Sequence, residues 1–237
     1  MAERLDKILS NAGLGSRKEI TRLIRSGLVT VFSETVTRPD FKVDINTDKI
    51  YLNGETVSYK EHYHIMLNKP KNVITATEDS REKTVLDLIS DEYPKKRLTP
   101  AGRLDKDTEG FVLLTTDGRL NHKITAPKGN GKHIEKIYYA ETNDCIDKKL
   151  VEKFKMGVIL EDGYLCKPAN LNIIDNHSCR LTISEGKFHQ VKRMFLAFNL
   201  TVTYLKRIKI GGLPLDESLS LGEYRELTDE EVKLLTN

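Results

Sequence analysis

Short strand-like runs follow one another through the chain after residue 62, without a regular alternation of strand and helix. These runs are rich in apolar, β-branched and aromatic residues and cover residues 64–67, 111–115, 134–141, 180–184 and 201–205. Helices are expected after Thr84 and Thr228, because each is followed three residues later by an acid that can complete a cap. Without repeated strand–helix–strand units, the sequence predicts an α+β fold with a mixed, largely antiparallel sheet.

The first sixty residues have a different pattern, which predicts two short helices and a few small strands. Apolar residues recur at helical spacing over residues 4–11, and Ser16 with Glu19 forms a capping box for a second helix that ends near Gly27. Strands are expected at residues 28–32, 50–52 and 55–57. We predict a small N-terminal domain over residues 1–58, a linker over 59–62 and a larger domain over 63–237.

Composition argues against several classes of protein. Of the 237 residues, 38% are hydrophobic and 31% are charged, and there is no run of about eighteen apolar residues to cross a membrane. The N-terminus opens with Met1-Ala2-Glu3-Arg4-Leu5 and lacks the apolar stretch of a secretion signal. Three widely spaced cysteines do not indicate a disulfide framework. We therefore expect a cytoplasmic protein with no membrane partner.

Basic residues are concentrated in windows that contain no acid, although the net charge is only +3. These windows cover residues 93–104, 118–134 and 186–215. In the second predicted helix, Lys18, Arg22 and Arg25 also fall on one face. If these segments meet in space, they form a positive surface that neutralises phosphates, which is typical of a nucleic-acid partner. Separately solvated basic faces are the alternative.

Asp105 is the candidate catalytic carboxylate because it lies in a loop that follows Gly102 and precedes the apolar run 111–115. Such a loop is rigidly supported yet reachable. Local chemistry alone favours a polar loop in which Arg103 and Lys106 pair with its acids. No metal is expected, because the twelfth position of a calcium loop starting at Asp105 is Thr116. His62 and His64 likewise have no third ligand nearby for zinc.

A second candidate segment covers residues 185–195. If it is helical from His189 onward, its apolar residues form a core stripe, while His189, Lys192 and Arg193 point elsewhere. Lys192 lies at the border of that stripe, where a cation can reach a partly buried partner. A cation close to an active-site carboxylate keeps it ionised. A solvated basic face is the alternative unless this segment lies beside Asp105.

The Gly-Arg-Leu-Asp stretch at 102–105, the run Lys136-Ile137-Tyr138 and residues 185–195 occur in the order seen in bacterial ribosomal pseudouridine synthases, which this chain resembles. Residues 4–7 and 12–19 resemble an S4 RNA-binding domain. Within the family, residues 181–186, 189–192, 210–212 and 221–225 are most similar to the small-subunit branch; large-subunit relatives more often have arginine in place of Lys192. Residues 31–34 depart from the valine-asparagine-glycine turn that is usual in S4 domains, so RNA contacts from that turn are in doubt.

The resemblance implies that a uridine is flipped out of the RNA, detached from C1′ and rejoined through C5 without a metal or an organic cofactor. Asp105 would be the catalytic carboxylate, acting either at C1′ or on the 2′ proton. Tyr138 would stack on the base and assist proton removal from C5, and Lys192 would keep Asp105 ionised. Packing of Tyr138 in an aromatic cluster with Tyr139 is the alternative for that residue.

The substrate implied by the resemblance is 16S ribosomal RNA in a small-subunit assembly intermediate, with uridine 516 as the target, and we expect a monomer. Residues expected to contact RNA are Arg4, Lys7, Arg17, Lys18, Arg22, Arg25, Arg103, Lys136, Lys187, His189, Gln190, Arg193 and Arg207. Two alternatives stay open. One is a 23S ribosomal RNA synthase of the same family, and the other is a non-catalytic S4-type RNA-binding or ribosome-assembly protein.

Overall fold

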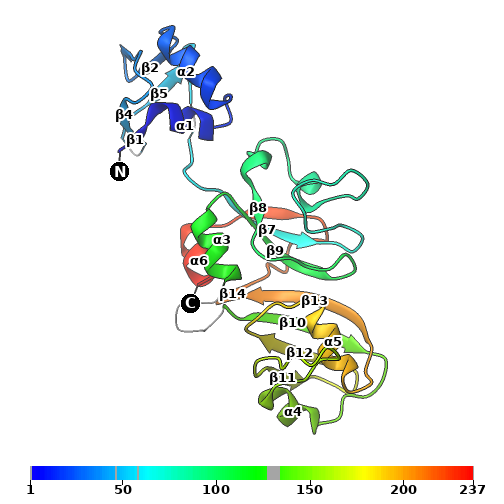
Figure 1. Cartoon of the computed structure of the whole chain (residues 1–237). Coiled ribbons are helices and arrows are strands. Elements are labelled where there is room, and N and C mark those ends of the chain that lie inside the picture. Colours follow the sequence, from blue (N-terminus) through cyan, green and yellow to red (C-terminus); the bar gives the residue numbers. More distant parts are fainter. Residues whose placement is uncertain (1, 46, 58, 127–133, 237) are drawn as a thin grey trace. The chain divides into compact units, whose positions relative to one another are not determined.

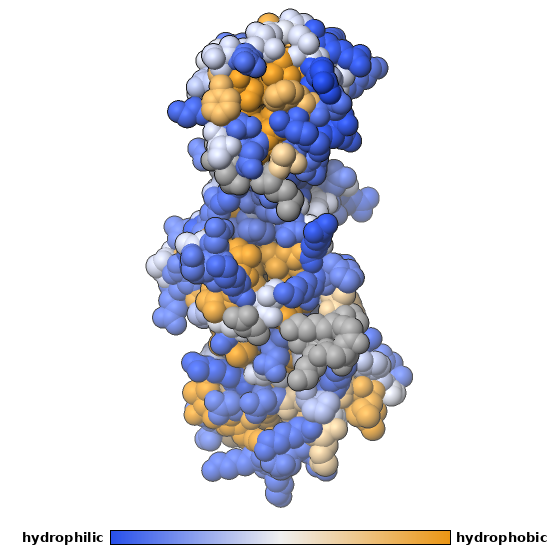
Figure 2. Space-filling view, turned by 90° about the vertical axis from the view of Figure 1, so that its left-hand side faces the viewer, coloured by the Kyte–Doolittle hydropathy of each residue, from blue (hydrophilic) through white to orange (hydrophobic). Residues whose placement is uncertain are grey.

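The computed structural model describes residues 2–45, 47–57, 59–126 and 134–236. It divides the chain into two compact units (Figure 1), one formed by residues 1–62 with 91–94 and the other by residues 63–90 with 95–237. On the face drawn in Figure 2, hydrophilic side chains dominate and apolar ones show in smaller groups. Within the described ranges, no helix has the length and apolar character needed to cross a membrane.

The N-terminal unit packs two helices against small strands. Helix α1 covers Leu5–Asn11 and α2 covers Arg17–Arg25. The predicted capping box is confirmed, because the Glu19 amide donates to Ser16 Oγ at 3.4 Å and the Ser16 amide donates to Glu19 Oε2 at 2.8 Å. The strands pair as β1 with β4 and in the order β3-β2-β5-β6. Their bounds are Ala2–Arg4 (β1), Val29–Val31 (β2), Glu34–Thr35 (β3), Lys42–Asp44 (β4), Ile50–Leu52 (β5) and Glu55–Thr56 (β6).

The larger unit is built on a nine-stranded sheet with the order β11-β12-β10-β13-β9-β7-β15, in which β14 pairs with β13 and β8 with β9. Among the described pairs of neighbouring strands, only β13 and β9 pair in parallel. The predicted α+β fold with a mixed, largely antiparallel sheet is therefore confirmed. The strands are His64–Lys69 (β7), Thr99–Pro100 (β8), Glu109–Thr115 (β9), Lys136–Thr142 (β10), Asn170–Ile173 (β11), Ser178–Ile183 (β12), Val202–Ile210 (β13), Leu213–Pro214 (β14) and Tyr224–Glu226 (β15).

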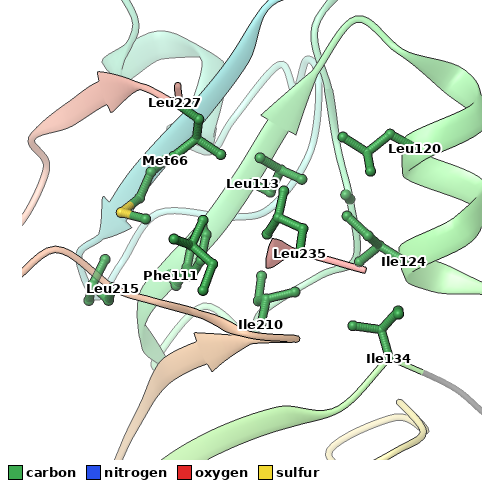
Figure 3. Close-up of a cluster of buried hydrophobic side chains, with 12 residues drawn as sticks. Met66, Phe111, Leu113, Leu120, Ile124, Ile134, Ile210, Leu215, Leu227 and Leu235 are labelled. Carbon is green, nitrogen blue, oxygen red and sulfur yellow. The ribbon is translucent and has the colours of Figure 1, made fainter. Parts of the chain in front are cut away.

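Strand β9 is buried at every position and anchors the hydrophobic cluster drawn in Figure 3. Helix α3 (Gly118–Thr125) contributes Leu120 and Ile124 to this cluster, beside Leu113 of β9, and Leu235 joins it just after helix α6 (Asp229–Leu234). Burial of this apolar surface fixes β9 rigidly in the sheet. Asp105 lies on the loop that leads into β9. The end of this loop is therefore firmly supported.

Helices α4 (Leu150–Met156) and α5 (Gln190–Leu196) pack against other strands of the same sheet. Their aromatic rings meet in the core, where the ring centroids of Phe154 and Phe195 are 5.2 Å apart. In β10, burial alternates along the strand, with Tyr138 buried and Tyr139 half-buried. Adjacent residues of a strand point to opposite faces of the sheet, so these two tyrosines belong to different faces.

Both predicted capped helices in the larger unit are present. Thr84 and Asp87 form a capping box that starts a short 3₁₀ helix, Val85–Leu88, and Thr228 with Glu231 does the same for α6. Another 3₁₀ turn covers Lys95–Arg97. The strand expected at 201–205 extends further, to Ile210. Residues 127–133 of the second acid-free window lie outside the described residues.

Candidate functional site

The loop that carries Asp105 is held on both sides by hydrogen bonds. Thr75 Oγ1 donates to the Leu104 carbonyl at 2.8 Å and lies 3.1 Å from the Leu104 amide, and the Thr108 amide donates to the Asp105 carbonyl at 3.1 Å. Gly102 opens the loop with a φ of 87°, a left-handed conformation that favours glycine. These contacts fix the backbone of Asp105, and its side chain is 28% exposed.

Lys69 also holds the Asp105 loop, through hydrogen bonds to backbone carbonyls. Its side chain is fully buried, and Nζ donates to the carbonyls of Pro70 at 2.9 Å and Thr108 at 2.8 Å, with that of Lys106 at 3.4 Å. Burial lowers the pKa of Lys69 to about 8, against the opposing attraction of Asp107, Asp105 and Glu109, while Arg207 lowers it further. Lys69 is thus a buried cation that ties together the backbone on both sides of Asp107.

Sequence reasoning missed Lys69 as a functional residue. The signal that was available is a lysine that ends the apolar run of β7 directly before Pro70. A lysine in that place needs hydrogen-bond partners in the protein interior. Only the fold shows that these partners are the carbonyls of the Asp105 loop.

Two basic side chains of the α5 segment lie beside Asp105. Lys192 Nζ is 3.5 Å from Asp105 Oδ2, and His189 Nε2 is 3.7 Å from Asp105 Oδ1. Lys192 also donates to Asp107 Oδ1 at 2.5 Å. Burial raises the pKa of Asp107, but the hydrogen bond and the charge of Lys192, together with weaker backbone and His189 contributions, hold it below its usual range. The structure therefore brings the two sequence-predicted segments together, with Lys192 between the carboxylates of Asp105 and Asp107.

A buried polar network sets the start of α5. Gln190 Nε2 donates to Glu185 Oε1 at 2.7 Å, and the Lys187 amide donates to Gln190 Oε1 at 2.9 Å. The Tyr164 hydroxyl donates to Glu185 Oε2 at 2.9 Å. The RNA contact expected of Gln190 does not fit this arrangement, because the side chain is only 4% exposed and both its amide groups are used internally. Its position suits holding the helix that presents Lys192.

Tyr138 is 8% exposed, and on β10 it lies opposite Arg207 of β13 and Leu181 of β12. The aromatic neighbour of Tyr139 is Tyr204, with ring centroids 6.0 Å apart. Because Tyr139 faces the other side of the sheet, the aromatic cluster expected as the alternative for Tyr138 forms around Tyr139 and Tyr204 instead. This leaves Tyr138 on the face of the sheet that it shares with Arg207.

Arg207 is the second expected RNA contact that the structure places in the interior. It is 2% exposed, and its Nε donates to the Phe111 carbonyl at 2.7 Å. A Cβ built on Gly102 would lie 4.0 Å from Arg207 Nη1. Arg207 thus lies between the strand of Tyr138 and the start of the Asp105 loop, so we assign it to holding the site rather than to phosphate contact.

The other basic residues of the larger unit differ in whether their charged groups are bound by other groups of the protein. Arg193 is bound to Glu161 and Asp162, each at 2.6 Å, and these carboxylates raise its pKa. Lys136 Nζ donates to the Ile124 carbonyl at 2.9 Å, and burial lowers its pKa to about 8. The Lys187 ammonium lies 4.5 Å from the centre of the Tyr164 ring. Arg103, next to Leu104, is exposed.

In the N-terminal unit, Lys18, Arg22 and Arg25 are exposed on α2, so their side chains are accessible to a partner. Other cations there are paired. Arg4 binds Asp6 through two bonds of 3.0 and 2.9 Å, and Arg17 Nε lies 3.8 Å from the same carboxylate. Lys7 binds Glu3 at 2.5 Å. The exposed pair of Lys7 and Glu3 is weak enough for phosphates to compete with it, whereas Arg4 and Arg17 share a buried carboxylate.

The side chains around Asp105 supply the groups for chemistry by a carboxylate. Among residues 2–45, 47–57, 59–126 and 134–236, no group of three or more His, Cys, Asp or Glu side chains could hold a metal ion. What the site presents is a partly exposed aspartate on a held loop, with the Lys192 ammonium and the His189 imidazole beside it. An ionised carboxylate in such surroundings can act as a nucleophile or as a base.

Comparison with protein families gives two matches. Residues 62–197 match the family model described as RNA pseudouridylate synthase, and residues 3–49 match that of the S4 domain. The first match contains Asp105, Tyr138 and Lys192, and the second contains the basic face of α2.

Similar proteins and structures span nearly the whole chain. An uncharacterised RNA pseudouridine synthase of Bacillus subtilis, YtzG, is 45% identical, with 98% of each chain covered. Ribosomal small subunit pseudouridine synthase A of Escherichia coli is 41% identical, with 97% of this chain and 98% of that protein covered. A crystal structure of a pseudouridylate synthase matches with a TM-score of 0.69 and 40% identity over 98% of this chain and 99% of that chain.

Proposed function

The chain belongs to the RNA pseudouridylate synthase family, and from that premise we propose that it converts one uridine of 16S ribosomal RNA to pseudouridine, with Asp105 as the catalytic carboxylate. The observation that carries the role of Asp105 is its place on a pinned loop, 3.5 Å from Lys192 and 3.7 Å from His189. The Lys192 ammonium favours the carboxylate form that the chemistry needs. The choice of 16S RNA is supported by similarity to proteins named as small-subunit enzymes.

In the proposed reaction, the target uridine leaves the RNA stack and enters the site, at a cost of a few kcal/mol. Asp105 then either attacks C1′, which breaks the bond from C1′ to N1 and leaves an ester, or removes the 2′ proton as that bond breaks, and the uracil turns. C5 then bonds to C1′, which in the first route displaces the Asp105 carboxylate and in the second is accompanied by return of the proton to C2′. C5 loses its proton, and N1 gains one. Tyr138 stacks on the base, and its hydroxyl assists the proton transfer from C5. Both routes need the carboxylate form of Asp105.

The two units divide the work of binding in this proposal. Lys18, Arg22 and Arg25 of α2 contact the phosphates of folded RNA, where shape and charge dominate recognition. Arg103, beside the catalytic loop, contacts a phosphate near the flipped nucleotide. We propose that the enzyme acts as a monomer in the cytoplasm on a small-subunit assembly intermediate, where 16S RNA is accessible.

The Asp105→Asn variant tests the catalytic role. Purified protein is incubated with a 16S ribosomal RNA transcript and with partly assembled small subunits, and pseudouridine is counted by tritium release from uridine labelled at C5. We expect no product from the variant, while its Kd for the RNA stays within about threefold of the wild type, because the amide removes the charge but not the phosphate contacts. Turnover by Asp105→Asn would overturn the assignment.

A further inference from the structure

Phe188 is the most exposed large apolar side chain in the described part of the chain, with 75% of its surface accessible. Single exposed apolar side chains are common on protein surfaces, but this one is held in place by a contact with the candidate site. The ring is not loose, because it lies flat on the imidazole of His189, with centroids 3.7 Å apart and an angle of 20° between the planes. One face of Phe188 is therefore occupied by His189.

The position of this aromatic pair connects it to the candidate active site. His189 Nε2 lies 3.7 Å from Asp105 Oδ1, so only the imidazole separates Phe188 from the catalytic carboxylate. The backbone of His189 is left-handed, with φ 48° and ψ 30°, and the Phe188 carbonyl accepts a bond from Arg193 Nη1 at 3.3 Å. The local backbone thus presents the ring in a defined orientation next to the site.

We propose that the open face of Phe188 stacks on a base of the RNA substrate that neighbours the flipped uridine. This inference rests on the proposed function, since it needs an RNA substrate with its target base at Asp105. A flipped uridine leaves its neighbours without a stacking partner, and an aromatic ring replaces that partner for any base. The target base itself is assigned to Tyr138, which is buried, whereas the exposed Phe188 suits a nucleotide that stays at the surface.

Electrostatics around the ring agree with this partner. Lys187 precedes Phe188 and is exposed, whereas Arg193, which binds the Phe188 carbonyl, is already paired with Glu161 and Asp162. The backbone of a bound nucleotide would therefore meet the Lys187 ammonium beside the stacking surface. An apolar protein partner would gain nothing from this charge, so the surroundings favour RNA.

The test compares Phe188→Leu, which keeps an apolar side chain but removes the ring, with Phe188→Trp, which keeps a ring. KM and kcat are measured on a fragment of 16S ribosomal RNA that contains the target uridine. Kd for the same RNA is measured with variants that also carry Asp105→Asn. We expect Phe188→Leu to raise KM and Kd about 5- to 100-fold, the range that base stacking supplies, with kcat within about threefold. Phe188→Trp should stay within about threefold of the wild type in all three.

Met156→Ala is the matched control, because Met156 is 66% exposed at the end of α4 and belongs to none of the contacts described for the site. It should leave KM and Kd unchanged. Far-ultraviolet circular dichroism and Tm check that each variant folds. A fall in kcat for Phe188→Leu with unchanged KM and Kd would overturn the proposal, because it would show that the ring serves only to position His189.

An RNA with an abasic nucleotide directly 5′ or 3′ of the target uridine completes the test. At one of these two positions, removal of the base should weaken binding to the wild type and abolish the difference between Phe188→Leu and the wild type. An undiminished effect of Phe188→Leu on both abasic RNAs would overturn the stacking inference while turnover of intact RNA still supported the proposed function. Absence of turnover by the wild type on ribosomal RNA would instead overturn the proposed function, and this inference with it.

Discussion

Replacement of the buried Lys69 by methionine should change how stability depends on pH. The pKa of Lys69 is lowered from 10.5 to about 8 by burial, while an unfolded chain keeps the ordinary value. Between these two pH values the unfolded state binds more protons than the folded state, so folding becomes more favourable as pH rises through this window. From pH 7 to pH 9.5, this linkage adds about 2 kcal/mol to the stability of the wild type, at about 1.4 kcal/mol per pH unit.

The Lys69→Met variant has no proton to release at this position and should not gain this stability. At pH 7 we expect the two proteins to be within about 2 kcal/mol of each other, because the lost bonds to Pro70 and Thr108, about 1.5 to 3 kcal/mol each, are largely offset by removal of the buried charge. At pH 9.5 the wild type should be more stable than Lys69→Met by about 2 kcal/mol more than at pH 7.

Urea unfolding of both proteins at pH 7 and at pH 9.5 measures this difference, and groups shared by the two proteins cancel in the comparison. Tryptophan is absent from the chain, so circular dichroism and tyrosine fluorescence follow the transition of the larger unit. A difference between wild type and Lys69→Met that stays constant from pH 7 to pH 9.5 would refute the argument that Lys69 is a buried cation with a lowered pKa.

Two further substitutions test the geometry around Asp105. Lys192→Met should lower kcat by about 100-fold, because it removes a cation 3.5 Å from the carboxylate. Lys192→Arg should recover most of the lost kcat in the same tritium-release assay. An equal loss of kcat in both variants would argue against a purely electrostatic role for Lys192. Gly110→Ala should destabilise the larger unit by about 3 kcal/mol or more, because Gly110 has a φ of 100° and an added Cβ would overlap the Arg207 carbonyl. Gly118→Ala, where the added Cβ meets nothing within 4 Å, is its control in urea unfolding, and similar stability of the two variants would contradict the close approach of β9 and β13.

Local sequence signals predicted the elements well because their causes are local. The capping boxes at Ser16, Thr84 and Thr228 each depend on residues three positions apart, and all three are present. The strand at residues 50–52 was predicted with its observed bounds, and the runs predicted at 64–67, 111–115, 134–141 and 180–184 overlap β7, β9, β10 and β12. The order of strands, and the parallel pairing of β13 with β9, depend on contacts distant in sequence and could not be predicted this way.

In the candidate site too, features with local causes could be predicted, whereas contacts between residues distant in sequence could not. Helical periodicity placed Lys192 at the edge of an apolar stripe, and the structure places it beside Asp105. Gln190 and Arg207 were expected to contact RNA, yet both are buried. Their partners, Glu185 for Gln190 and the Phe111 carbonyl for Arg207, are brought close only by the fold. Lys69 escaped notice for the same reason.

The most direct test of the central claim is a map of pseudouridines in ribosomal RNA by carbodiimide treatment and reverse transcription. Bacteria that lack the gene are compared with the same bacteria carrying the wild-type gene or Asp105→Asn. We predict that one pseudouridine of 16S RNA disappears without the gene, at the position expected for the small-subunit branch, and that the wild type restores it but Asp105→Asn does not. Loss of a pseudouridine from 23S RNA instead, or its restoration by Asp105→Asn, would contradict the account.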